Sequence, residues 1–180
     1  MNVHVFPLAS TSKLDARSAT IEPSRVAAAR QIADDLTAVG MKVDVRAVPF
    51  GQLVDQVARG RTFDALLVGI TVGNDPDPYP FFHSSQVSDP GDDFSGYSTL
   101  AVDRLLEQAR KTVDQAKRRE LFAQVWTAIA TDVPVVFLYY TDYLYAQSHS
   151  VRGLKVAPVN DPPQRFWNVE DWYVKTVARQ

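Results

Sequence analysis

The sequence contains no cysteine. This absence excludes disulfide bonds, thiolate catalysis and cysteine-based zinc sites together. It does not define the compartment, because an oxidising compartment permits disulfides without requiring them. An excess of one charge is also missing, since 19 basic and 21 acidic residues give a formal net charge of −2. Such a balanced chain has no field that attracts nucleic acid or an anionic membrane, so neither is expected as a partner.

Long apolar runs and targeting segments are missing as well. The longest apolar run is too short to span a bilayer. The first residues, from Asn2 to Phe6, already alternate like a strand and show no basic region, apolar core or cleavage site of a signal peptide. We expect either a cytoplasmic protein or a piece of a longer chain to which a methionine has been added.

Sequence motifs of common catalytic sites are absent. There is no nucleophile elbow, zinc-protease helix, phosphate-binding loop or dinucleotide fingerprint. His83 and Ser84, with a nearby aspartate, could belong to a catalytic triad, but neighbours in sequence do not make one. We expect His83 to make a local hydrogen bond in a loop. The motifs therefore give no indication of a catalytic site.

Five aspartates fall in an irregular stretch in the middle of the chain and are candidates for a metal site. Loop carboxylates can bind Ca²⁺, but this spacing matches no EF-hand, and aspartate followed by proline or glycine is common in turns. We therefore expect turn chemistry and no metal. The five residues are Asp75, Asp77, Asp89, Asp92 and Asp93.

The first seventy residues show the alternation of an α/β fold. Of the 180 residues, 46% are hydrophobic, which is enough for one domain with a real core. A polar loop is expected over residues 9–20. The order strand, helix, strand, helix, strand implies right-handed crossovers and a largely parallel sheet. The predicted elements are strands over residues 3–8, 41–48 and 63–70, and helices over residues 23–39 and 50–59.

The second half begins with a stretch, residues 71–98, in which periodicity disappears. Two helices are predicted next, over residues 100–111 and from Asp114, a good N-cap residue, to about residue 130. The basic run from Lys117 to Arg119 is expected on the solvated face of the second helix. A strand over residues 135–140 follows. The whole pattern predicts an α/β fold with a mixed, largely parallel sheet flanked by helices.

The strand over residues 63–70 selects a candidate ligand site. It is a nearly continuous apolar run, which suits a strand covered on both faces. Ligands of such sheets bind beyond the carboxyl ends of the strands. There Gly73 lets a ligand approach the backbone, and Asn74 and Asp75 offer hydrogen-bonding groups; the alternative is a turn stabilised by Asx hydrogen bonds. The predicted ligand contacts are Thr71, Val72, Gly73, Asn74 and Asp75.

Two tyrosines are further candidates for ligand contact. Tyr140 ends the aromatic strand that begins near Phe137, and a tyrosine just beyond a strand's carboxyl end can line a cleft. Tyr97 lies among the aromatic residues of the irregular stretch. Core or edge packing is the alternative for these aromatic side chains.

Four stretches, taken in order, carry a resemblance to a known family. They combine a helix, turn and strand, a strand that leads into a "D-P" loop, a helical block beginning with tyrosine, and a proline-led aromatic strand. The stretches are IADDLTAVGMKVDV (Ile32 to Val45), GRTFDALLVGITVGNDPDP (Gly60 to Pro78), YSTLAVDRLLEQARKTVDQAKRRELF (Tyr97 to Phe122) and Thr131 to Gly153. This order resembles the C-terminal half of the family 5 extracellular solute-binding proteins, the oligopeptide-, dipeptide- and nickel-binding components of ABC importers. Thr99 replaces the family's usual asparagine.

The resemblance implies one lobe of a periplasmic-binding-protein-like fold of type II. Residues 1–165 would form the C-terminal ligand-binding lobe, and residues 166–180 would cross back to a missing N-terminal lobe. The full-length protein would be an extracellular or periplasmic lipoprotein, a monomer that works with ABC transporter permease subunits. It would close its two lobes on a small-molecule or peptide solute by a hinge motion, without catalytic residues or an obligatory cofactor.

The same resemblance raises a question about the solute. Peptide-binding members hold the peptide's amino terminus with an aspartate, and that position falls on Asn74 here, with Asp75 beside it. An asparagine supplies hydrogen bonds but not the charge partner of an ammonium group. A sugar, a small amide or another neutral solute is therefore open alongside a peptide. Two other functions stay open: the ligand-sensing domain of a transcriptional regulator built on the same module, and an α/β enzyme.

Overall fold

A five-stranded sheet organises the first part of the chain. The computed structural model describes residues 2–7, 13–19, 23–70, 75, 77–140, 142–157, 159 and 162–174. The strand order is β3-β2-β4-β1-β5. The strands are β1 (Asn2–Pro7), β2 (Lys13–Ala19), β3 (Lys42–Val48), β4 (Ala65–Ile70) and β5 (Val136–Tyr140).

The strand directions make the sheet mixed, which confirms the predicted class of fold. β2 pairs in parallel with both β3 and β4, whereas β1 runs antiparallel to both β4 and β5. Two expectations were wrong. The first strand is not parallel to its neighbours, and the polar loop predicted over residues 9–20 contains β2. The strand was missed because Lys13–Ala19, apart from Leu14, carries small and charged residues rather than the large apolar ones that mark a buried strand.

Helices connect the parallel strands on the expected pattern. α1 (Pro23–Ala38) begins at the predicted proline. Gly40 follows with φ of 94°, a left-handed conformation that stops a helix at little cost to glycine. After β3, the short α2 (Phe50–Gln52) continues into a π-helical turn, η1 (Leu53–Ala58), where the sequence predicted one short helix.

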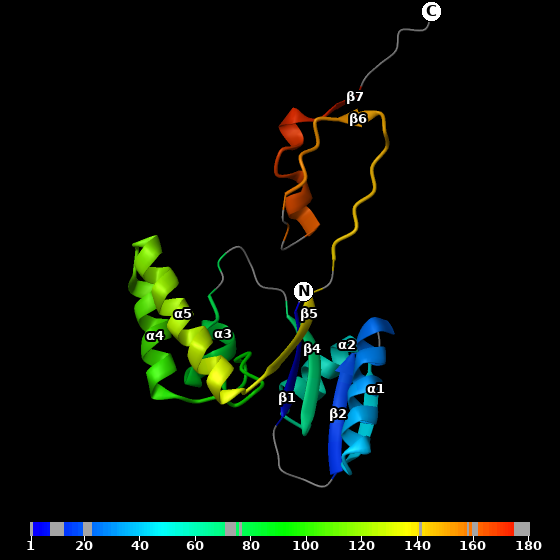
Figure 1. The fold of residues 1–180 in the computed structure, drawn as a ribbon, viewed down its shortest axis with the longest axis vertical. Coiled ribbons are helices and arrows are strands. Elements are labelled where there is room, and N and C mark those ends of the chain that lie inside the picture. Colours follow the sequence, from blue (N-terminus) through cyan, green and yellow to red (C-terminus); the bar gives the residue numbers. More distant parts are fainter. Residues whose placement is uncertain are drawn as a thin grey trace, which may run out of the picture.

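An antiparallel helix pair dominates the next part of the chain. The irregular stretch contains α3 (Tyr79–Phe82) and a 3₁₀ turn, η2 (Ser84–Gln86). α4 (Leu100–Lys111) has the predicted bounds, and α5 (Gln115–Asp132) is capped as expected, since the Asp114 carboxylate accepts the Lys117 N–H at 2.8 Å. Figure 1 shows α4 and α5 side by side on the β5 side of the sheet, with α3 next to them.

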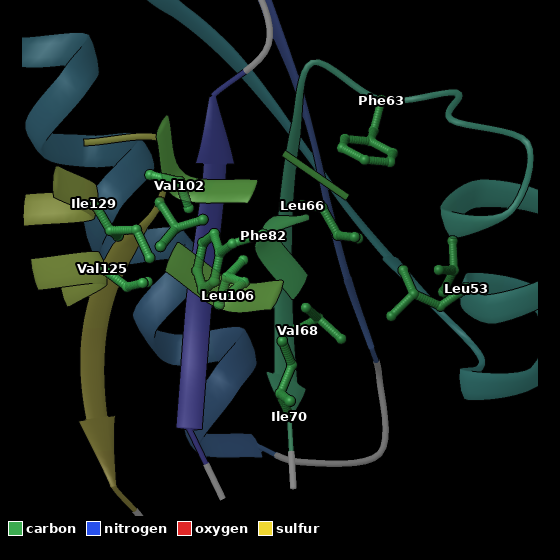
Figure 2. Close-up of a cluster of buried hydrophobic side chains, with 12 residues drawn as sticks. Leu53, Phe63, Leu66, Val68, Ile70, Phe82, Val102, Leu106, Val125 and Ile129 are labelled. Atoms are coloured by element: carbon green, nitrogen blue, oxygen red, sulfur yellow. The ribbon is translucent and has the colours of Figure 1, made fainter. Parts of the chain in front are cut away.

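Both faces of β4 are covered, as its apolar sequence predicted. Leu66, Val68 and Ile70 belong to the main core, together with residues of η1, α3, α4 and α5. The alternate residue Leu67 packs with Ala29 of α1 on the opposite face. In Figure 2 the Phe82 ring lies between the side chains of α4 and α5 and those of β4. β4 is therefore a rigid base for whatever follows its carboxyl end.

The last described residues form a small unit that lies apart from the sheet in Figure 1. It contains β6 (Val151–Arg152) paired with β7 (Tyr173–Val174), and the 3₁₀ turns η3 (Pro162–Phe166) and η4 (Val169–Asp171). The buried Asn168 links the residue that follows β6 to the residue that precedes β7, because its Nδ2 donates to Gly153 O and its Oδ1 accepts from Trp172 Nε1. The domain boundary at residue 165 and the crossing of residues 166–180 to another lobe stay predictions.

Candidate functional site

The strand ends predicted to form the site meet at one edge of the sheet. Ile70, the last residue of β4, and Tyr140, the last residue of β5, both pair with Asn2 of β1. The carboxyl ends of β4 and β5 therefore lie on either side of the beginning of β1. Thr71, Val72, Gly73 and Asn74 lie outside the described residues, and their contact with a ligand stays a prediction.

The two tyrosine candidates lie at different places. Tyr140 is 77% exposed at this edge. Tyr97 Oη instead donates to Asp132 Oδ2 at 2.6 Å, and Asp132 ends the helix that precedes the amino end of β5. Partial burial and this hydrogen bond raise the pKa of Tyr97. The structure thus brings Tyr140 to the end of β4, and it places Tyr97 near the other end of β5.

Asp75 is held by an arginine of α5. Arg118 Nη2 donates to Asp75 Oδ1 at 2.8 Å and to Oδ2 at 2.7 Å. The hydrogen bond to the carboxylate raises the pKa of Arg118. The Asp75 side chain remains 57% exposed, whereas that of Arg118 is 18% exposed. Asp75 is thus fixed on one side and faces solvent on the other.

A second arginine holds the next acid along the chain. Arg110 Nε donates to Asp77 Oδ2 at 2.6 Å, and its guanidinium lies 3.6 Å from the centre of the Tyr79 ring. Asp77 Oδ1 accepts the Tyr79 N–H at 3.0 Å. Asp77 therefore joins the start of α3 to α4.

The sequence did not indicate these two arginines as part of the candidate site. The basic run was expected on a solvated face, which is right for Lys117 and Arg119 but wrong for Arg118, which is half-buried. The available signal was the helical spacing: Arg118 precedes the inward-facing Phe122 by four residues, and residues four apart share one helix face. Its guanidinium lies 4.9 Å from the centre of the Phe122 ring.

His83 makes the local hydrogen bond that the sequence predicted. Its Nδ1 accepts the Ser85 N–H at 3.1 Å. The Ser84 hydroxyl donates directly to Asp103 at 2.6 Å rather than to the imidazole. His83 Nε2 lies 3.9 Å from Asp103 Oδ1 and 3.7 Å from Glu107 Oε1, which is too long for a hydrogen bond. The arrangement is that of a buried polar junction between η2 and α4.

The loop aspartates have partners that fit turn and anchor chemistry. Asp89 pairs with Arg59 at 3.0 Å, and Asp93 Oδ1 accepts the N–H groups of Ser95 and Gly96. Within the part of the chain that the structure describes, no three acidic or histidine side chains converge as metal ligands would. Nor does any helix there have the length and apolar character needed to cross a membrane.

The mixed sheet with helices on both faces is the fold of one lobe of a periplasmic-binding-protein-like solute-binding protein. The solved oligopeptide-binding protein AppA of Bacillus subtilis, in complex with a nonapeptide, matches 91% of this chain with a TM-score of 0.75 and 26% identity. DppA, an ABC transporter-associated periplasmic binding protein from Helicobacter pylori in complex with the peptide STSA, matches 91% with a TM-score of 0.70; at 23% identity this likeness shows the fold alone.

Sequence comparison leads to the same group of proteins. The curated oligopeptide-binding protein AppA of Bacillus subtilis is 29% identical over 144 residues, which is 79% of this chain. No protein-family model matches the chain. The predicted resemblance to the family 5 solute-binding proteins is confirmed by these relatives, which are named for binding rather than for catalysis. The regulator alternative finds no support among them.

The match covers only part of each relative. The chain spans 26% of the length of the curated AppA and 32% of the solved AppA chain. It therefore corresponds to one lobe of proteins that are several times longer.

Proposed function

We propose that this chain is the ligand-binding lobe of an ABC importer's solute-binding protein, which captures a peptide or another small solute between two lobes. The observation that carries the proposal is the match over 91% of the chain to a solved oligopeptide-binding protein in complex with a nonapeptide. The edge at which β4 and β5 end supports it, because ligands of α/β sheets bind beyond the carboxyl ends of strands. The protein binds and releases its solute without catalysis.

Within this proposal the ligand contacts are those at the end of β4, with Tyr140 beside them. They are Thr71, Val72, Gly73, Asn74 and Asp75, and Tyr97 is a more distant contributor. The missing N-terminal lobe supplies the other wall of the site, and closure buries the solute between the lobes. The full-length protein acts as a monomer outside the cytoplasmic membrane, anchored as a lipoprotein, and delivers solute to permease subunits.

The encoded sequence upstream of residue 1 tests the anchoring. A lipoprotein signal followed by a further lobe is the expected result. A helix-turn-helix domain in that position would instead favour the regulator and would contradict the import role.

Titration calorimetry on the full-length protein tests solute capture and the site together. The tetrapeptide Ser-Thr-Ser-Ala and the neutral sugar mannohexaose are suitable probes of the two solute classes. Asn74→Ala should weaken binding of the active probe about tenfold, because it removes the one or two hydrogen bonds that the side-chain amide would make to the solute. Gln124→Ala, on the exposed side of α5, should leave the affinity unchanged.

The two ways in which this experiment can fail are separable. If neither probe binds, capture of peptides and oligosaccharides is wrong. If a probe binds but Asn74→Ala behaves like Gln124→Ala, the assignment of the site to the end of β4 is wrong while capture stands.

A further inference from the structure

We infer that Arg118 of α5 is a positioning residue for the solute site, because it fixes the place of Asp75 and sets a positive charge beside it. The inference rests on the proposed function in one respect: Asp75 is taken as a ligand contact. It adds the α4–α5 hairpin to a site that strand ends alone had defined. It also assigns the chemistry that Asp75 offers to a solute.

The contact between Arg118 and Asp75 has the properties of a built anchor. One guanidinium nitrogen, Nη2, reaches both carboxylate oxygens, at 2.8 and 2.7 Å. The arginine is seated on the ring of Phe122, which is only 7% exposed. Because packing already restricts the arginine, less side-chain entropy is lost on pairing than in an exposed ion pair.

Asp77 repeats the arrangement two residues later. Its carboxylate accepts from Arg110 at 2.6 Å and from the Tyr79 N–H at 3.0 Å, and its side chain is 15% exposed. Arg110 lies in the last turn of α4, and Arg118 lies in the first turn of α5. The segment that leads into α3 is therefore attached at two points to the same end of the helix hairpin.

The pairing also changes what Asp75 presents to a solute. Its negative charge is matched by Arg118 on one side, while its exposed side can still accept hydrogen bonds. A neutral donor, such as an amide N–H or a hydroxyl, gains such a bond without needing a full counter-charge. A bare cation meets a carboxylate whose charge is already compensated. The geometry therefore points to an uncharged hydrogen-bond donor of the solute at Asp75.

Arg118→Met in the full-length protein tests the positioning role. The change keeps an apolar stem over Phe122 but removes the donor to Asp75. We expect about tenfold weaker binding of Ser-Thr-Ser-Ala, or of mannohexaose if that is the active probe. Arg118→Lys keeps a cation that can reach Asp75 and should restore part of the lost affinity.

The matched control is Arg119→Met, which removes the same charge one residue along the same helix. Arg119 is exposed and contacts only the Gln115 carbonyl among the described residues, at 3.3 Å. The affinity of the Arg119→Met variant for the same probe should stay within about twofold of that of the wild type. Exchange of the amide hydrogens of Asp77, Tyr79 and Phe81 should be faster in Arg118→Met than in Arg119→Met, with or without solute.

A double-mutant cycle with Asp75→Asn distinguishes positioning from general damage. If Arg118 acts through Asp75, then Asp75→Asn combined with Arg118→Met should bind no more weakly than the worse of the two single variants. Equal affinity of Arg118→Met and Arg119→Met, or equal exchange rates, overturns the inference. If the wild type binds neither probe, the proposed function fails, and the exchange comparison still decides whether Arg118 holds Asp75.

Discussion

Phe82→Ala should lower the free energy of unfolding by about 3–5 kcal/mol, the usual cost of truncating a buried phenylalanine. Phe82 is 1% exposed and is the largest fully buried side chain among the described residues. Its ring packs edge-on against Tyr97 and Trp126, at centroid distances of 6.4 and 6.0 Å. Truncation would leave a cavity where α3 meets α4 and α5. Urea denaturation followed by far-ultraviolet circular dichroism measures the change.

Phe50→Ala is the control for this prediction. Phe50 opens α2 and is 48% exposed, so it loses far less apolar contact on truncation. Its variant should lie within about 1 kcal/mol of the wild type. A Phe82→Ala variant that is no less stable than Phe50→Ala would mean that α3 does not pack into the core as the structure has it.

Phe82 also shows where sequence patterns stopped being informative. It lies in a stretch without periodicity, so no pattern assigned it to the core, although the aromatic content of that stretch indicated packing. α3 has four residues, Tyr79–Phe82, which is too short to show a helical repeat. By contrast, α4 was predicted residue for residue, because apolar residues recur along it at helical spacing.

The sheet was predicted in class but not in topology. Large apolar residues made β4 recognisable, and its two covered faces follow from that composition. β2 has only one such residue, Leu14, and so the strand that pairs with both β3 and β4 was missed. The same omission explains the wrong direction predicted for β1. Because β2 was not recognised, the parallel crossover was assigned to β1, whereas it begins at β2.

The sheet edge at which the candidate site is proposed could be predicted from the sequence, but the ion pairs beside it could not. The end of β4 could be placed at a sheet edge because strand order and ligand position are linked in α/β folds. The pairing of Asp75 with Arg118 joins residues 43 positions apart, and no local pattern specifies such a contact. Long-range ion pairs of this kind depend on how helices pack, which the chain order alone leaves open.

Arg61, which precedes β4, holds the later part of the irregular stretch, much as Arg118 holds Asp75. Its Nη2 donates to Val87 O at 2.9 Å and to Gly91 O at 3.0 Å, and its guanidinium lies 4.7 Å from the centre of the Phe94 ring. Burial lowers the pKa of Arg61, and the nearby Asp93 opposes that shift. Asp93 is itself 1% exposed, and burial raises its pKa.

Arg61→Met should therefore cost about 3 kcal/mol, because it leaves two carbonyls without a donor and a buried carboxylate without its counter-charge. Methionine keeps the Cβ, so the left-handed backbone at residue 61, with φ of 51°, is equally strained in both proteins. Arg59→Met is the control, since its partner Asp89 is an exposed residue; that loss should stay below about 1 kcal/mol. Denaturant unfolding of the three proteins gives the comparison.

The pH dependence of the Arg61→Met deficit separates lost charge from lost packing. The pKa of Asp93 is raised above the unfolded value of 3.8, so the stability held by its neutral form is complete below that value and is lost as pH rises through the folded pKa. Removing Arg61 raises the folded pKa further. The deficit should therefore be larger near pH 7 than near pH 4, and Asp93→Asn added to Arg61→Met should recover much of it. A deficit that is the same at both pH values would assign the cost to the lost hydrogen bonds and packing alone.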